Sequence, residues 1–256
     1  RIQSAPDPYP ISQPGHSGLG SGARVWVWGG LDPDFFNLTY FNTGSIYDLN
    51  TLSWTAISNT GAPSVRANPV VLYDGSQVIV WGGQNPNLLK DGALYDPATD
   101  TWTLIPTDPV LNNLAGGNQA FLAQGRLVVI GVDSGTGITG GIYDLTTQTW
   151  TALNAAGAPT GRVEYTLIST GKTITLFGGR TAGTYYNDVY TFDPVANSWS
   201  SSSLTNAPTA RARHGACWTG EEMIIFGGNT TGVPYLQDPA ILQSPGFSSY
   251  YLYRKN

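Results

Sequence analysis

The segment Val78-Ile-Val-Trp-Gly-Gly83 decides the fold, because an apolar run of this kind, ending in glycine, recurs along the whole chain. A second signature follows each of the first four runs, as where Tyr95-Asp96 precedes Trp102. Such self-similarity, at a spacing of about fifty residues, indicates a repeat protein whose stacked units share one core. The apolar runs are Val25–Gly30, Val78–Gly83, Leu127–Gly131, Ile174–Gly179 and Met223–Gly228.

Each repeat is predicted to contain four antiparallel strands, a to d. A short strand such as His214–Trp218 comes first, the glycine-terminated run is strand b, and the Tyr-Asp and Trp positions mark strands c and d. Strands that are apolar on successive residues need cover on both faces, which stacked units supply. The aspartate is expected to accept hydrogen bonds from backbone amides two residues on, and the tryptophan to pack between units. The second signature recurs as Tyr47-Asp48 and Trp54, Tyr95-Asp96 and Trp102, Tyr143-Asp144 and Trp150, and Phe192-Asp193 and Trp199.

These residues resemble the kelch repeat, which has a glycine pair after strand b, a tyrosine on strand c and a tryptophan about six residues later. The resemblance implies a β-propeller. The sequence therefore predicts an all-β fold, a single five-bladed kelch-type β-propeller with four antiparallel strands in each blade. The third repeat departs from the pattern, because Gly131 is followed by Val132 and a glycine-rich loop is expected over Asp133–Gly141.

One propeller domain is expected over residues 1–256, although a fragment of a larger ring is the alternative. In the fifth blade, strand c is predicted at Ser249–Tyr253, after which no strand d remains. Counting back from Gly29 places Arg1–Ala5 at the strand d position, so this N-terminal strand is predicted to complete the last blade and close the ring. The predicted blades are 11–59, 60–108, 109–157, 158–206, and 207–256 together with 1–10.

Composition excludes several classes of protein. The net charge is −5 and the twelve Lys and Arg residues form no basic run, which excludes nucleic acid as a partner. The apolar stretches are strand-sized, so no membrane span is expected. The single cysteine, Cys217, rules out an internal disulfide. A composition poor in lysine and rich in Ser, Thr, Asn and Gly is typical of extracellular proteins, and a start at Arg1 is compatible with processing; we expect a secreted protein, extracellular or periplasmic.

Long loops predict a binding face. Strand alternation puts the loop that enters strand a and the b–c loop on one face of each blade. The longest b–c loops are expected at Leu31–Gly44 and Asn229–Ser248, in blades 1 and 5, which ring closure makes neighbours. Their aromatic residues Phe35, Phe36 and Tyr235 could stack on a sugar or anchor a protein partner, or could instead fold back over the rim.

Polar side chains also recur at the entry to strand a, where they are expected to line the mouth of a central channel. The resemblance implies an alternative for the arginines, which in kelch repeats bridge neighbouring blades through backbone carbonyls. Two histidines and a carboxylate can form a metal site or perform acid–base chemistry, but packing is the alternative, and we predict no metal, cofactor or catalytic residue. The candidate ligand-binding residues at this position are Arg66, Arg162, Glu164, Arg211, Arg213, His16 and His214.

Kelch proteins mostly mediate interactions, so the resemblance implies a non-enzymatic extracellular binding or scaffolding propeller. It would recognise a protein or a glycan through the b–c loop face near blades 5 and 1. One alternative is a sugar-processing enzyme, epimerase-like or lyase-like, in which Arg66, Arg162 or Arg211 holds an anionic substrate and Glu164 or a histidine serves as acid or base. The other is a structural subunit of a larger assembly.

Overall fold

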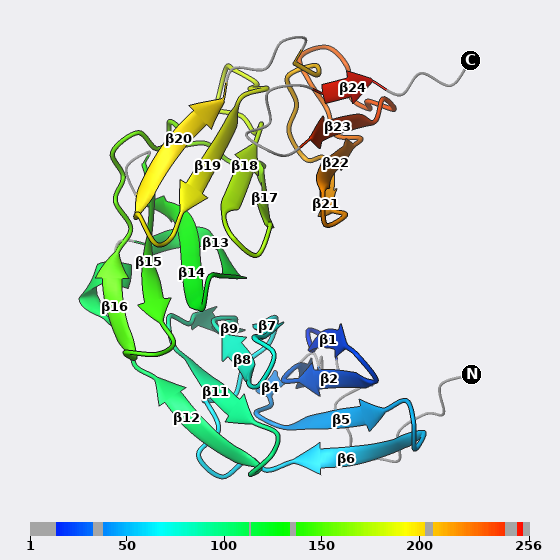
Figure 1. The fold of residues 1–256 in the computed structure, drawn as a ribbon, viewed down its shortest axis with the longest axis vertical. Coiled ribbons are helices and arrows are strands. Elements are labelled where there is room, and N and C mark those ends of the chain that lie inside the picture. Colours follow the sequence, from blue (N-terminus) through cyan, green and yellow to red (C-terminus); the bar gives the residue numbers. More distant parts are fainter. Residues whose placement is uncertain are drawn as a thin grey trace. The chain divides into compact units, whose positions relative to one another are not determined.

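The computed structural model describes residues 14–32, 38–112, 114–133, 137–202, 207–243 and 250–252. The chain divides into two compact units, residues 1–109 and 110–256, and each is described by itself. The first unit holds two four-stranded antiparallel sheets and the second holds three, each with its strands in chain order from a to d (Figure 1). These sheets confirm the prediction of an all-β, five-bladed propeller. The prediction of one domain over the whole chain stays a prediction.

The bounds of the strands follow the repeat. Strands a are β1 (Ser17–Ser21), β7 (Val70–Tyr73), β13 (Leu114–Ala123), β17 (Thr166–Ser169) and β21 (Gly215–Trp218). Strands b are β2 (Arg24–Trp28), β8 (Val78–Trp81), β14 (Arg126–Asp133), β18 (Ile174–Phe177) and β22 (Glu222–Phe226). Strands c are β5 (Gly44–Asp48), β11 (Gly92–Asp96), β15 (Ile138–Asp144), β19 (Val189–Asp193) and β23 (Ala240–Gln243). Strands d are β6 (Ser53–Ile57), β12 (Thr101–Ile105), β16 (Thr149–Ala152), β20 (Ser198–Ser202) and β24 (Tyr250–Leu252).

Short elements lie between these strands. The b–c loop of blade 1 contains the ribbon β3 (Leu31–Asp32) with β4 (Thr39–Tyr40), and that of blade 2 contains β9 (Gln84–Asn85) with β10 (Asn87–Leu88). One 3₁₀ turn, η2, covers Pro109–Leu111. The part of the chain that the structure describes contains no α-helix.

The tyrosine and tryptophan of the repeat form a cross-strand pair. Tyr95 on β11 lies directly opposite Trp102 on β12, with ring centroids 5.0 Å apart. Trp102 also contacts the preceding blade, because its ring lies 4.5 Å from Trp28 and its Nε1 donates a 2.7 Å hydrogen bond to the carbonyl of Ser58. Aromatic pairs at these separations add to the stabilisation that burial supplies. The predicted packing of the tryptophan between blades is therefore confirmed for this pair.

The aspartate after each strand c starts the c–d turn as predicted. In blade 4, one carboxylate oxygen of Asp193 accepts hydrogen bonds from the amides of Val195 at 2.8 Å and Ala196 at 3.1 Å. Asp48, Asp96 and Asp144 accept equivalent bonds in blades 1 to 3. This side chain satisfies amides that the tight turn leaves without backbone partners.

Replacing Asp193 with Ala is expected to lower the free energy of unfolding by about 1 kcal/mol, because the two amides lose their acceptor. Asp193→Asn keeps an acceptor oxygen and is expected to retain most of the stability. Denaturant unfolding followed by tryptophan fluorescence measures both variants. Equal losses in the two would show that acceptance by this side chain does not stabilise the turn.

The glycine pairs end strand b because the chain there approaches the loop that enters strand a. A Cβ on Gly83, which has a φ of +86°, would lie 2.5 Å from the carbonyl oxygen of Ala67. Gln84, directly after the pair, forms a two-way backbone bridge with Ala67. The strand a entry loop and the b–c loop thus lie on one face, as predicted, and we call this the entry face of a blade.

Blade 3 follows a different course because it lacks the glycine pair. Strand β14 continues to Asp133 and β15 begins at Ile138, so most of the loop predicted over 133–141 is strand instead. The glycines serve close packing of strands, since a Cβ on Gly140 would meet the carbonyl oxygen of Val129. Without a second glycine to break it, the b–c hairpin simply extends.

The fifth blade corrects two predictions. Its strand c is β23, Ala240–Gln243, while the segment predicted as strand c forms strand d as β24. All four strands thus come from residues 215–252, and the sheet does not take its strand d from the N-terminus. Arg1–Ala5 lie outside the described residues. The physical reason for the different strand c is that β23 carries no Tyr-Asp signature, whereas the tyrosines that follow it resemble the strand c pattern.

Candidate functional site

Three buried arginines hold the b–c loops in place. Arg66 is 0% exposed, and its Nε donates to the carbonyl of Ser64 at 2.8 Å. Its Nη1 donates to the carbonyls of Gly82 and Asp91 at 2.9 and 3.0 Å, and its Nη2 to the side chains of Ser64 and Asp91. All five guanidinium donors are therefore used within the protein. Gly82 and Asp91 are the two ends of the b–c loop, so the arginine closes that loop.

Arg162 and Arg211 repeat this arrangement in blades 4 and 5. Arg211 donates to the carbonyls of Gly227 and Asp238, both at 3.1 Å, and to the Asp238 carboxylate at 2.6 Å. Nη1 of Arg162 donates to the carbonyl of Gly178 and to the carboxylate of Asp188, and the guanidinium lies 3.8 Å from the centroid of the Tyr186 ring.

Arg66 and Arg211 also join neighbouring blades, but through their main chain. The carbonyl of Arg66 accepts a 2.9 Å bond from the amide of Gly30 in blade 1, and the carbonyl of Arg211 accepts one from Gly179 in blade 4. The bridging that the family resemblance implied thus uses backbone groups, while the guanidinium groups stay within their own blade. Because those groups are buried and bonded to protein acceptors, their geometry gives no support to ligand binding by Arg66, Arg162 or Arg211.

His214 is packed between blades 4 and 5, with only 6% of its surface exposed. Its Nε2 is hydrogen-bonded to the hydroxyl of Thr166 at 2.8 Å, and its ring meets Phe177 edge-on. Burial, with a smaller contribution from the charge of Arg211, lowers the pKa of His214 to about 4. The side chain is therefore a neutral core residue at neutral pH, and it does not face an open channel.

The members of the predicted cluster of two histidines and a carboxylate come from both units, and their proximity stays a prediction. His16 lies in the first unit, just before β1, while Glu164 and His214 belong to the second. Within the described ranges, no three His, Cys, Asp or Glu side chains are grouped so as to hold a metal ion.

The residue two places after each of these arginines has a left-handed backbone. Asn68, Glu164 and Arg213 have φ values of +52°, +60° and +56°. This conformation is easy for glycine, tolerable for asparagine, and costs other residues about 1–2 kcal/mol. The amide of Arg213 donates to the carbonyl of Glu164 at 3.0 Å, so these two charged residues meet where blades 4 and 5 adjoin.

Glu164 lies between two arginines on the entry face. Its carboxylate accepts hydrogen bonds from Nε and Nη2 of Arg180, and a 2.7 Å bond from Nη2 of Arg213. The bonds from Arg180, and then those from Arg213, lower the pKa of Glu164 to about 2. A carboxylate so strongly held in its ionised form is poorly suited to donate a proton at neutral pH.

Arg180 and Asn229 were not among the predicted site residues, although the sequence carries a signal for both. Each directly follows a glycine pair, and each lies sixteen residues after a left-handed residue, by the differences 180−164 and 229−213. Both pair with the strand a entry of their own blade through backbone bridges. In blades 4 and 5, repeat position therefore places two residues on the entry face, one from each loop.

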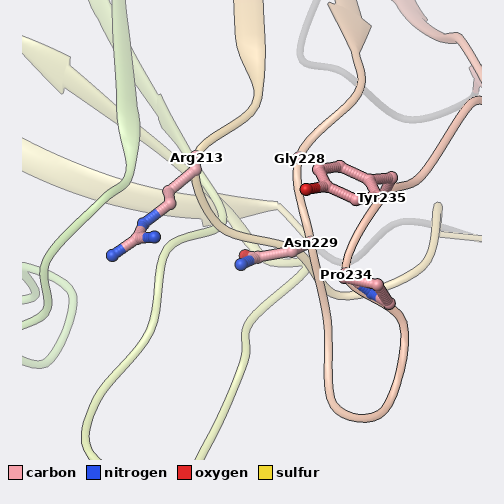
Figure 2. Close-up of a pocket in the computed structure, with 5 residues that line it drawn as sticks. All are labelled: Arg213, Gly228, Asn229, Pro234 and Tyr235. Atoms are coloured by element: carbon pink, nitrogen blue, oxygen red, sulfur yellow. The ribbon is translucent and has the colours of Figure 1, made fainter.

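A pocket of about 380 Å³ opens on the entry face of blade 5. Arg213 and Asn229 contribute the two repeat positions just described, and Asn229 extends toward Arg213, with Tyr235 and Pro234 on its other side (Figure 2). Arg213 has 63% of its side chain exposed, and Tyr235 is 82% exposed. The lining residues are Arg213, Gly228, Asn229, Pro234 and Tyr235.

The structure thus brings together two of the predicted ligand-binding residues, Arg213 and Tyr235, with Glu164 beside them. Tyr235 lies on the b–c loop as predicted, but this loop is shorter than predicted because β23 begins at Ala240. Phe35 and Phe36 lie outside the described residues. The expected proximity of the blade 1 and blade 5 loops stays a prediction.

A second pocket in the same unit, of about 390 Å³, offers less chemistry. It is lined mainly by small or apolar residues and by no charged or aromatic side chain. Its lining residues are Gly137, Ile138, Ala155, Ala158, Pro159, Thr160, Gly161 and Thr181.

Comparison with known families agrees with this architecture. A family model described as the Attractin/LZTR1 β-propeller matches residues 25–253, from the second strand of the first sheet to the end of the last. None of the helical segments in the described ranges is long and apolar enough to cross a membrane.

Proposed function

This chain belongs to the Attractin/LZTR1 β-propeller family, whose repeats are of the kelch type, and from that premise we propose that it is a protein-binding scaffold with its contact surface on the entry face of blade 5. The observation that carries the proposal is Tyr235. A tyrosine that is 82% exposed on a shaped pocket rim leaves most of its ring in water until a partner covers it. Tyrosine and arginine are also the residue types that contribute most to protein interfaces.

The loop that carries Tyr235 is held by hydrogen bonds along its length. Arg211 bonds its two ends at Gly227 and Asp238, and the amide of Leu236 donates to the carbonyl of Gly228 at 2.8 Å. Thr230 and Val233 form a further backbone bridge. A loop fixed in this way loses little conformational freedom when it binds, which favours affinity.

Replacing Tyr235 with Ala tests the proposal. A display library of random twelve-residue peptides is selected on the immobilised wild-type protein, and the enriched peptides are synthesised. Their affinity for Tyr235→Ala is expected to fall at least tenfold, because the exposed ring is the largest contact group of the pocket. The stability of the variant is expected to stay within about 0.5 kcal/mol of wild type, as is usual for exposed sites.

Leu88→Ala provides the matched control, since Leu88 is an exposed apolar residue on the b–c loop of blade 2. It is expected to leave the peptide affinities unchanged. If no peptide is enriched, or if every enriched peptide binds Tyr235→Ala as well as wild type, this surface is not the binding face and the proposal fails.

We further propose that this function is exercised outside the cell. The support is the composition, poor in lysine and rich in small polar residues. Antibody detection of the native protein in the culture medium, and not in the washed cell fraction, is the expected result. Retention inside intact cells would contradict it.

A further inference from the structure

We infer that Arg213 binds a carboxylate of the partner, so that the pocket on blade 5 selects acidic protein segments. This inference rests on the proposed function and names the chemistry that the same pocket recognises. Arg213 would be its specificity-determining residue, and Glu164 a positioning residue that holds it.

The first support is the free edge of the Arg213 guanidinium. All guanidinium donors of Arg66 are hydrogen-bonded to acceptors in the protein. For Arg213, the hydrogen bond described involves only Nη2, which donates to Glu164. The remaining donors belong to a side chain that is 63% exposed and that lines the pocket. Guanidinium groups present donors in a planar fork that matches a carboxylate, and such charge-assisted pairs are the strong ones.

The second support is the local charge. On the entry face of blades 4 and 5, each buried arginine has its own aspartate, at Asp188 and Asp238. Glu164 alone faces two guanidinium groups, those of Arg180 and Arg213. This cluster therefore carries an uncompensated positive charge in a chain whose net charge is −5. A guest carboxylate on the open side of Arg213 would complete the pairing.

The third support is the backbone cost of placing an arginine here. The equivalent position of blade 1 is Gly15, with a φ of +73°, which glycine adopts without strain. Arg213 takes the same conformation at φ +56° and is then held at 2.7 Å by Glu164 across the boundary between blades. Strained, preorganised side chains of this kind are found where a fold serves binding.

The remaining pocket walls fit a carboxylate on a side chain of a peptide. The Tyr235 ring offers apolar surface to the methylene groups that precede an Asp or Glu carboxylate, and the Asn229 amide lies beside Arg213 (Figure 2). Asn229 lies between this ring and Arg213, so the pocket offers an apolar group at one end and a charged group at the other (Figure 2).

The experiment uses the peptides enriched on the wild-type protein. In each, every Asp or Glu is replaced in turn by Asn or Gln, and affinities for wild type and for Arg213→Gln are measured by calorimetry at two salt concentrations. In each peptide, we expect one acidic residue whose replacement by its amide weakens binding to wild type about tenfold. The same replacement is expected to weaken binding to Arg213→Gln less than twofold. Arg24→Gln, at another exposed arginine paired with an aspartate, is expected to behave like wild type.

The outcomes separate the inference from the function beneath it. The inference is overturned, while the protein-binding function stands, if the enriched peptides require Tyr235 but contain no acidic position that matters for binding. The same holds if their preference for a carboxylate is unchanged in Arg213→Gln. The proposed function itself is overturned if the enriched peptides bind Tyr235→Ala as well as wild type, or if no peptide is enriched. A preference that depends on Arg213 and weakens at the higher salt concentration supports both.

Discussion

Replacing Arg211 with Met is expected to lower the free energy of unfolding of the C-terminal unit by about 3 kcal/mol, because several acceptors lose a donor that is itself buried. Arg211 is fully buried and donates to Asp238 and to the carbonyls of Thr209, Gly227 and Asp238. Methionine fills similar volume but donates nothing. The three carbonyls and the Asp238 carboxylate, whose side chain is 37% exposed, then lose their donor.

Urea unfolding followed by circular dichroism and tryptophan fluorescence measures the loss. Arg213→Gln is the matched control, because it removes a largely exposed arginine two residues away and is expected to cost no more than about 1 kcal/mol. Adding Asp238→Leu to Arg211→Met removes the stranded carboxylate and is expected to restore part of the stability. If Arg211→Met cost no more than Arg213→Gln, the arginine would not be what holds the b–c loop.

The sequence predicted those parts of the fold that depend on contacts between residues close together in the chain. The Tyr-Asp and Trp positions recur in four blades because cross-strand pairing and the c–d turn require them within one hairpin, as for Tyr95, Asp96 and Trp102. Blade 5 lacks this signature on β23, so its strands c and d could not be told apart by pattern. Pairing between β22 and β23 depends on tertiary packing, which a repeat count does not contain.

The sequence marks the entry to strand a in each repeat, but it does not show which of the side chains there face the solvent. Pattern alone marks Arg211 and Arg213 equally, as two arginines at the entry to strand a. In the structure, Arg211 is 0% exposed and bonded within its own blade, whereas Arg213 has a left-handed backbone and a side chain that is 63% exposed. A non-glycine residue with positive φ has no sequence signature when it is Glu or Arg.

His214 is expected to make the stability of blades 4 and 5 depend on acidity. Its pKa is lowered to about 4 in the folded protein, against 6.5 for an ordinary histidine. The unfolded chain therefore binds a proton more readily, so folding stability is fully present above about pH 6.5 and falls as the pH drops toward 4. The whole loss is about 3 kcal/mol, and it levels off below the folded pKa. The physical cause is the cost of placing a charge among Phe177, Thr166 and Arg211.

Unfolding free energies measured between pH 7.5 and 4 for wild type and His214→Gln test this. The variant is expected to be less stable at pH 7.5, where the packing of the ring is lost, but to lose about 3 kcal/mol less on acidification. Glu164 provides an internal comparison, because its pKa is lowered from 4.5 to about 2. The stability that its ionised carboxylate contributes is fully present above pH 4.5 and is lost only as the pH falls toward 2. If the unfolding free energy of His214→Gln still falls between pH 6.5 and 4.5 as in wild type, another group causes the acid sensitivity. If that fall disappears, His214 is the proton-sensitive residue, and it lies directly behind Arg213 and the Tyr235 loop.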